Sequence, residues 1–345
     1  QAVYLNRGRR LNYGAQVGHV PYIQVLTGPP PASDSSAAPF LTRYYQRTYI
    51  SQAAGIAALP LNTSQRFEAE AGYQRIGYGL EYDRFILDGQ NIVYEGRESV
   101  PNFEVDALNL AVGGLAFVGD YSYFGFSSPV RGGRYRFGVN GTVGSLDYAT
   151  VTADYRQYLF MRPPGIPDRF PITLAVRGMH YGRYGPDSET GRLYPLYLGY
   201  GTLVRGYSSG SFNDDQTYTE FIDRLYGNRI AVAGAELRMP ILGVPSYGLI
   251  NFPYIPTELV LFADAGMAWG TIDSFSAIVV DENNEQSQIT VQFGTSFSEQ
   301  RPVASVGASL RLNLLGAIVL EPYYAIPLSR NDVSGVIGLN FSPGW

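Results

Sequence analysis

The sequence predicts an all-β protein, a transmembrane antiparallel β-barrel. Only 16% of its 345 residues are charged and 45% are hydrophobic, whereas soluble chains carry about 25% charged residues. The mean hydropathy is nevertheless only -0.07, so the apolar residues are dispersed, and no run approaches the roughly 18 to 20 apolar residues of a membrane-spanning helix. Glycine (40), tyrosine (28) and phenylalanine (18) are abundant, as in barrel strands flanked by aromatic girdles.

Apolar and polar side chains alternate with a period of two along nearly the whole chain. In 303–314, small or polar residues at odd positions, such as Ser305 and Arg311, alternate with apolar residues at even positions. The same alternation occurs in 10–18, 66–74 and 147–160. Several runs exceed ten residues, the length that a tilted membrane strand of about 9 to 11 residues needs, whereas soluble sandwiches use about 5 to 6. The pattern therefore favours a barrel over a soluble β-protein.

The alternation divides the chain into thirteen expected strands. Bacterial barrels have even strand numbers, so the odd count predicts that further strands lie upstream of Gln1. We take 1–345 as one outer-membrane barrel domain, with its first strands and any periplasmic domain upstream. The expected strands are 2–6, 10–23, 42–58, 66–86, 106–123, 131–142, 147–161, 170–183, 228–239, 257–269, 302–313, 316–327 and 333–341.

Long and short connections alternate between these strands. The short turns frequently carry Gly or Pro and are expected on the periplasmic side, since bacterial barrels have short periplasmic turns and long external loops. The segment 240–256 is a longer exception on the inner side. The long polar segments, expected to face outward as loops, are 24–40, 87–104, 184–226 and 270–301.

Composition excludes several function classes. A net charge of -5 argues against a nucleic-acid partner, and the absence of cysteine excludes disulfides and thiolate metal sites. We expect no catalytic residue, cofactor or metal. Gly206-Tyr207-Ser208-Ser209-Gly210 matches the G-x-S-x-G pattern of hydrolases, but it lies in a loop and not at a strand-to-helix turn, so we interpret it as coincidence. His180 is expected to be a lumen or rim residue rather than a ligand.

The acidic run at 281–285 has two possible interpretations. Its carboxylates could hold calcium or bridge lipopolysaccharide through divalent cations, although it lacks the glycine of an EF-hand loop. A solvated outer loop is the favoured reading.

A family resemblance is carried by residues 204–207 and the two strands after them. Val204-Arg205-Gly206-Tyr207, late in a very long loop, resembles the Val-Arg-Gly-aromatic signature of the BamA/TamA-like outer-membrane assembly superfamily, the bacterial surface antigens. The segments 227–240 and 261–266, which includes Asp264 and Gly266, resemble the two strands that follow this loop in the family. The turn 129–132 also resembles a periplasmic turn of these barrels.

The resemblance implies a barrel of sixteen strands with a loop directed into its lumen, located in the bacterial outer membrane. It implies a role in insertion or translocation of proteins, with outer-membrane lipid, lipopolysaccharide and client polypeptides as partners. The closest likeness is to a branch with an N-terminal periplasmic β-propeller, so the alternative is an anchor or secretion conduit for a periplasmic or surface domain or partner subunit. A diffusion porin is a third, less favoured alternative, because a loop in the lumen would obstruct it.

The last strand approximates the terminal signal that the outer-membrane assembly machinery reads in the family. Gly335, Leu339 and Phe341 match this signal in residue type. The spacing differs by one residue, and four residues follow the expected final aromatic position.

Elementary electrostatics assigns a structural role to the signature arginine. Glu236 lies on the polar face of its strand, and Asp264 shares a face with Gly266. If the two strands pair in register, both carboxylates face the lumen close together, where an arginine fork between them would relieve their repulsion. We therefore expect Arg205 to lock the loop inside the barrel.

Overall fold

The computed structural model describes residues 1–28, 42–88, 91–100, 105–162, 172–212, 221, 224–244, 247–271, 275–280, 286–291 and 301–343. Within these residues, no helix has both the length and the apolar character required to cross a membrane.

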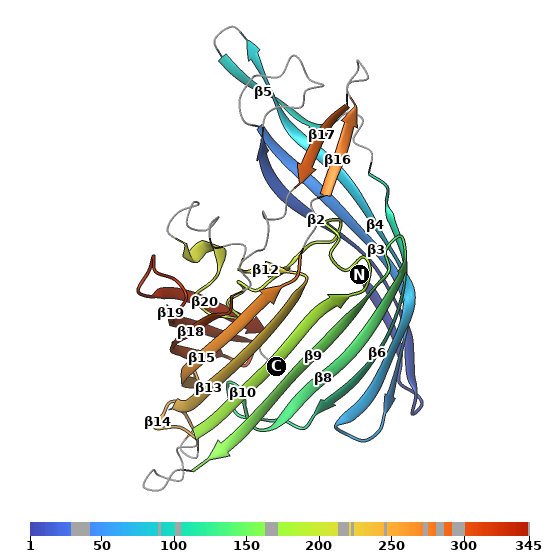
Figure 1. Ribbon diagram of the computed structural model, residues 1–345. Coiled ribbons are helices and arrows are strands. Elements are labelled where there is room, and N and C mark those ends of the chain that lie inside the picture. The colour runs from blue at the N-terminus through green and yellow to red at the C-terminus, as the bar shows by residue number, and fades with distance from the viewer. Residues whose placement is uncertain are drawn as a thin grey trace.

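The fold is one large antiparallel sheet that curves into a barrel wall (Figure 1). Thirteen strands follow one another in chain order around this wall, which confirms the strands expected from the alternation. Each forms an antiparallel ladder with the next one. They are β1 (Ala2–Asn6), β2 (Asn12–Gly28), β3 (Thr42–Pro60), β4 (Gln65–Asp88), β6 (Leu108–Asp120), β8 (Pro129–Gly144), β9 (Tyr148–Met161), β10 (Ile172–Tyr184), β13 (Arg229–Gly243), β15 (Thr257–Trp269), β18 (Val303–Leu314), β19 (Ile318–Pro327) and β20 (Val336–Pro343).

Shorter strands are attached to this wall or stand beside it. Three of them join the main sheet: β5 (Asn91–Ser99) pairs with β4, β7 (Tyr123–Phe124) with β8, and β14 (Ile250–Asn251) with β13. The other four form two separate two-stranded sheets. These sheets are β11 (Leu196–Tyr197) with β12 (Tyr226–Gly227), and β16 (Phe275–Val280) with β17 (Gln286–Val291).

All four of the segments expected to be long loops contain some strand, so the prediction was wrong in those places. In 184–226 this strand is mainly the short β11–β12 pair. β2 continues to Gly28, β4 continues to Asp88 and pairs with β5, and the β16–β17 hairpin occupies part of 270–301. The physical reason is the distribution of polar side chains on these strands. Where a strand rises beyond the membrane, polar side chains stand on both faces, so the alternation disappears while the backbone ladder continues.

The two faces of the wall differ as the alternation predicts. Tyr13, Tyr155 and Tyr324, expected on the apolar faces, are 47%, 41% and 47% exposed. Polar and small residues occur at inward positions of the wall, and some of them are buried, including Asp264 of β15 and Ser305 of β18. The exposed outer face is therefore apolar and aromatic, as a barrel surface in contact with lipid requires.

The strand order ends at β1 on one side and at β20 on the other, and within the described residues no ladder joins the two. Their outward side chains are strongly exposed, including Tyr4 on β1 and Ile337 on β20. A free strand edge in a bilayer leaves backbone donors and acceptors unsatisfied at a cost of several kcal/mol each.

We expect a charge on the outer face to destabilise the folded barrel. Leu115, in the middle of β6, is 65% exposed, and Leu115→Arg should reduce the free energy of unfolding in lipid bilayers by about 2 to 4 kcal/mol if the residue lies near the membrane midplane. Leu315→Arg, in the exposed turn after β18, is the matched control and should change it by less than about 0.5 kcal/mol. Equal effects of the two substitutions in urea titrations would contradict a lipid-facing position for Leu115.

Candidate functional site

The connection between β10 and β13 turns back into the barrel and packs against the inner wall. Leu198, Val204 and Tyr207 of this connection, which we call the lumen loop (residues 185–228), are fully buried. They share one hydrophobic cluster with inward residues of the wall, including Val232 and Val303. At about 25 cal/mol per Å² of buried apolar surface, such packing stabilises the loop in the lumen independently of its charges.

Two glycines permit this close approach. An added Cβ at Gly266 of β15 would lie 2.8 Å from side-chain carbons of both Leu198 and Val204, so any larger residue there would displace the loop. Gly206 has a φ of +91°, in the left-handed region that glycine adopts without strain. Its added Cβ would also lie 3.2 Å from the Cβ of Ala325 in β19.

Arg205 of the lumen loop binds three carboxylates of the wall. It binds the Asp264 carboxylate in a bidentate manner, Nε to Oδ2 at 2.8 Å and Nη2 to Oδ1 at 3.1 Å. Nη2 also donates to Glu236 Oε1 at 2.7 Å, and Nη1 donates to Glu321 Oε1 at 3.0 Å. The guanidinium carbon lies 3.7 Å from the ring centroid of Phe262, a cation–π arrangement. One buried side chain thus joins the loop to β13, β15 and β19.

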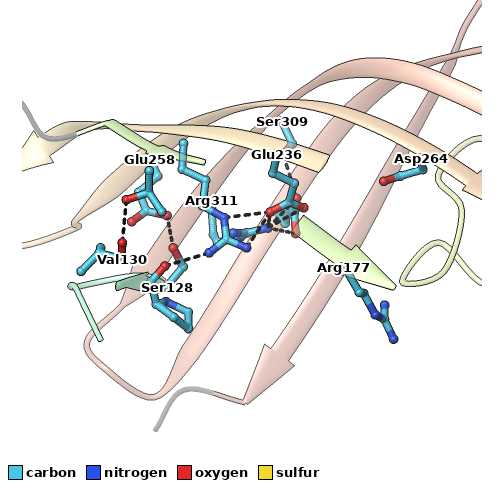
Figure 2. A network of polar contacts seen from close by, with 12 residues as sticks. Ser128, Val130, Arg177, Glu236, Glu258, Asp264, Ser309 and Arg311 are labelled. Atoms are coloured by element: carbon cyan, nitrogen blue, oxygen red, sulfur yellow. Dashed lines mark hydrogen bonds and ion pairs between the residues drawn. The ribbon is translucent and has the colours of Figure 1, made fainter. Parts of the chain in front are cut away.

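Two further arginines complete the network around Arg205. Arg238 Nη2 lies 2.7 Å from Glu236 Oε2. Arg311 Nη2 lies 3.4 Å from Glu236 Oε2 and 3.1 Å from Glu321 Oε2. Figure 2 shows Arg311 and Glu236 joined by dashed lines. Together with Arg205 and Asp264, the network holds three arginines and three carboxylates. Burying charges is tolerable only when they are paired and hydrogen-bonded, and this charge balance meets that condition.

Three members of this network were not assigned to it from the sequence. Arg311 was identified on the small, polar face of its strand, but no partner was assigned to it, and Arg238 and Glu321 were not considered as site residues. Because Glu321 on β19 is three strands away from Glu236 on β13 along the wall, barrel curvature is needed to bring the two together. The alternation of β19 contained a usable signal, since a glutamate interrupts the apolar residues around it.

A second anchor holds the lumen loop beyond Arg205. The Tyr207 hydroxyl donates to the Ala304 carbonyl at 2.7 Å and accepts from the backbone N–H of Ser329 at 3.2 Å. Arg330, in the connection between β19 and β20, donates to the Gly206 carbonyl at 3.0 Å and to Ser211 Oγ at 2.8 Å. The loop is therefore also tied to the connection that leads into the last strand.

The edge strand β20 contacts the loop directly. Asn340 Nδ2 donates to the Gly201 carbonyl at 3.0 Å. Of the terminal-signal residues, Leu339 and Phe341 point outward and are strongly exposed, while Gly335 precedes β20 against the ring of Tyr324. Recognition of these three residues by an assembly machinery stays a prediction.

The remaining candidate positions fall outside this network. His180 binds the Ile230 carbonyl and the Tyr184 hydroxyl and stacks on Trp269, among the aromatic residues of the rim. Ser208 precedes a single 3-10 turn in the lumen loop, and Ser209 is the first residue of that turn. The acidic run 281–285 lies outside the described residues. Among the residues that are described, no group of three or more His, Cys, Asp or Glu side chains is arranged to hold a metal ion.

The comparison with protein families decides the identity of this barrel. Residues 120–344 match the model of the Omp85 superfamily domain, a range that contains the lumen loop and every residue of the charge network. This chain belongs to the Omp85 superfamily. Membership places it in the bacterial outer membrane, in agreement with the apolar outer face and with the resemblance of residues 204–207.

A comparison with solved structures supports the same fold. The chain is similar to BamA from Haemophilus ducreyi in a crystal structure that lacks POTRA domains 1–3, with a TM-score of 0.53 and 17% sequence identity. The match covers 97% of this chain and 59% of that one, so the chain spans about three fifths of the BamA chain. No curated protein sequence matched the chain.

Removing the Arg205 guanidinium should loosen the lumen loop of this Omp85 barrel. Arg205→Ala leaves Glu236, Asp264 and Glu321 facing one another in a buried site, and breaking a buried pair in this way costs about 3 to 5 kcal/mol. Arg205→Lys should recover only a minor part, because a point charge cannot serve several acceptors with fork geometry. Heat-dependent mobility in detergent gels would measure the loss of stability, and limited proteolysis would report the exposure of the loop. Arg131→Ala, at an exposed arginine of β8, is the control that should retain wild-type behaviour.

The second anchor should respond to pH through Asp332, which lies in the connection between β19 and β20. A hydrogen bond from Arg330 lowers the pKa of the Asp332 carboxyl. The unfolded carboxyl titrates near about 3.9, so the stabilisation it confers should be complete above that value and disappear as pH falls through the lower folded-state pKa. The melting temperature of Asp332→Asn should therefore lie below that of the wild type by a constant difference from pH 5 to 7. That difference should shrink below pH 4, and a difference that grows on acidification would contradict the assignment.

Proposed function

We propose that this barrel inserts or translocates polypeptides at the outer membrane and uses the lumen loop as a structural lock. The observation that carries the proposal is the position of Arg205, which fixes a superfamily signature loop to three strands inside the wall. Membership of the Omp85 superfamily supports it, because that superfamily comprises barrels for outer-membrane protein assembly and translocation. We do not propose an enzymatic activity.

The lumen loop disfavours a plain diffusion porin. Its buried residues occupy the inside of the wall beside β10, β13 and β15, and Arg205 crosses to Glu321 on β19. A pore for small solutes would need this space to be open water. The loop and its ion pairs are thus better suited to a barrel that changes state when a client arrives than to a permanently open channel.

The two free edges support polypeptide handling. Among the described residues, β1 and β20 each pair with a neighbouring strand on one side only, and such edges pair readily with strands of another chain. We propose that upstream strands or a partner subunit cover these edges in the resting barrel, and that client strands are the polypeptides handled there. Because Asn340 of β20 binds the lumen loop, the position of the loop and the position of this edge are linked.

An insertion assay tests the proposal. The full-length protein is reconstituted in liposomes, and a small urea-unfolded outer-membrane barrel is added as client. We expect faster folding of the client, measured by its heat-dependent gel mobility, than in empty liposomes. Arg205→Ala, normalised to the amount of folded protein, should lose at least several-fold of this acceleration because the loop is no longer held in one position. Arg131→Ala is the matched control and should retain it.

Two results would overturn the proposal in different ways. A wild-type protein that does not accelerate insertion, and does not transport a fused passenger, would leave the anchor for a periplasmic or surface domain as the better reading. Full activity in Arg205→Ala, with the loop shown to be displaced by proteolysis, would separate polypeptide handling from the lock.

A further inference from the structure

A partly open chamber lies inside the wall and is lined in part by residues of the charge network. Its volume is about 320 Å³. The residues that line it include Gly201, Thr202 and Leu203 of the lumen loop, and Ser127 and Ser128 of the turn before β8. This turn is fixed in place, because Ser128 Oγ donates to the buried Glu258 carboxylate at 2.7 Å, as Figure 2 shows. A buried hydrogen bond therefore fixes part of the chamber lining.

Three arginines form a row on one side of this chamber. In the register of the sheet, Arg134 of β8 is the direct partner of Arg156 of β9, and Arg156 is the direct partner of Arg177 of β10. All three line the chamber. Like charges directly opposite one another on adjacent strands are destabilising, so this row needs negative charge nearby.

The described residues supply only one carboxylate to the row. Asp154 binds Arg156 through two hydrogen bonds, at 3.0 Å and 2.7 Å, and reaches Arg177 at 3.4 Å. Asp120, opposite Arg134 in register, instead accepts from Ser122. Within the described part of the chain, no carboxylate forms a salt bridge with Arg134. The three carboxylates on the far side of the chamber are already matched by Arg205, Arg238 and Arg311.

Arg177 shows unused hydrogen-bonding capacity. One of its terminal nitrogens donates to the Thr202 carbonyl of the lumen loop at 3.1 Å, while its Nε is buried and has no hydrogen-bond partner among the described atoms. Figure 2 shows this side chain standing apart from the Glu236–Arg311 network. The row thus combines two positive charges in excess with an unsatisfied buried donor.

We propose that the chamber is a binding site for a small oxyanion, a phosphate or a carboxylate, held between Arg134 and Arg177. Guanidinium groups bind both anions with the same two-pronged geometry, and the bidentate contact of Arg156 with Asp154 shows that geometry within the row. The bound anion would neutralise the excess charge and satisfy the free donor. The site does not depend on polypeptide handling, because none of its three arginines belongs to the Arg205 network.

Equilibrium dialysis of the full-length protein in detergent tests the site. The probes are radiolabelled inorganic phosphate and acetate, at constant ionic strength maintained with chloride. We expect one saturable site per chain for at least one of the two probes. Arg134→Gln and Arg177→Gln should each weaken it at least tenfold, and Arg131→Gln, which removes the same charge from an exposed position on β8 that does not line the chamber, should not.

A second measurement needs no variant and so does not depend on correct folding of a mutant. Phenylglyoxal modifies accessible arginines, and mass spectrometry locates the modified residues. Phosphate or acetate should protect Arg134 and Arg177 in the wild-type protein and leave Arg131 reactive. Protection by only one probe would identify which oxyanion the site takes. Binding no tighter than that of chloride, or protection that is equal at all three arginines, would overturn the proposal.

Discussion

The arrangement of this barrel depends on three carboxylates inside the wall, one buried and two largely buried, whose charges the arginines of the wall balance only in part. Glu236, Asp264 and Glu321 project into the same region of the lumen from β13, β15 and β19. Arg238 and Arg311 come from the wall, but the third guanidinium comes from the lumen loop. The three carboxylates are therefore balanced by three arginines only when the loop lies inside the barrel. The position of the loop thus depends on charges of the wall as well as on the loop itself.

Two glycines and a second set of hydrogen bonds also hold the lumen loop inside the barrel. Gly266 leaves the space that Leu198 and Val204 occupy, and Gly206 brings the backbone close to Ala325. The second anchor, formed by Tyr207 and Arg330, ties the loop to the connection that leads into β20. A displacement of the loop thus requires the loss of ion pairs, apolar packing and backbone hydrogen bonds together. Such coupled contacts favour two discrete positions over a gradual drift.

The sequence was sufficient for the wall and for part of the site. A period of two predicts which residues face lipid, because each strand of a membrane barrel separates lipid from lumen, and Tyr155 and Tyr324 follow that rule. It failed where β2 and β4 continue beyond the lipid, since nothing there requires alternation. The pairing of Arg205 with Glu236 and Asp264 was accessible from neighbouring strands. Glu321 was not, because its proximity arises from curvature over several strands, which a local pattern does not encode.

The strands of the wall are very unequal in length. β2, β3 and β4 have 17, 19 and 24 residues, whereas β19 and β20 have 10 and 8. At about 3.3 Å per residue, the first group extends tens of ångströms farther than the second, and Figure 1 shows β2 to β5 rising well above the last strands. The mouth of the barrel is therefore cut obliquely. At that end, the wall is tall on the side of the first strands and short on the side of β18 to β20. A macromolecule therefore reaches the lumen loop most directly from the side of the short strands.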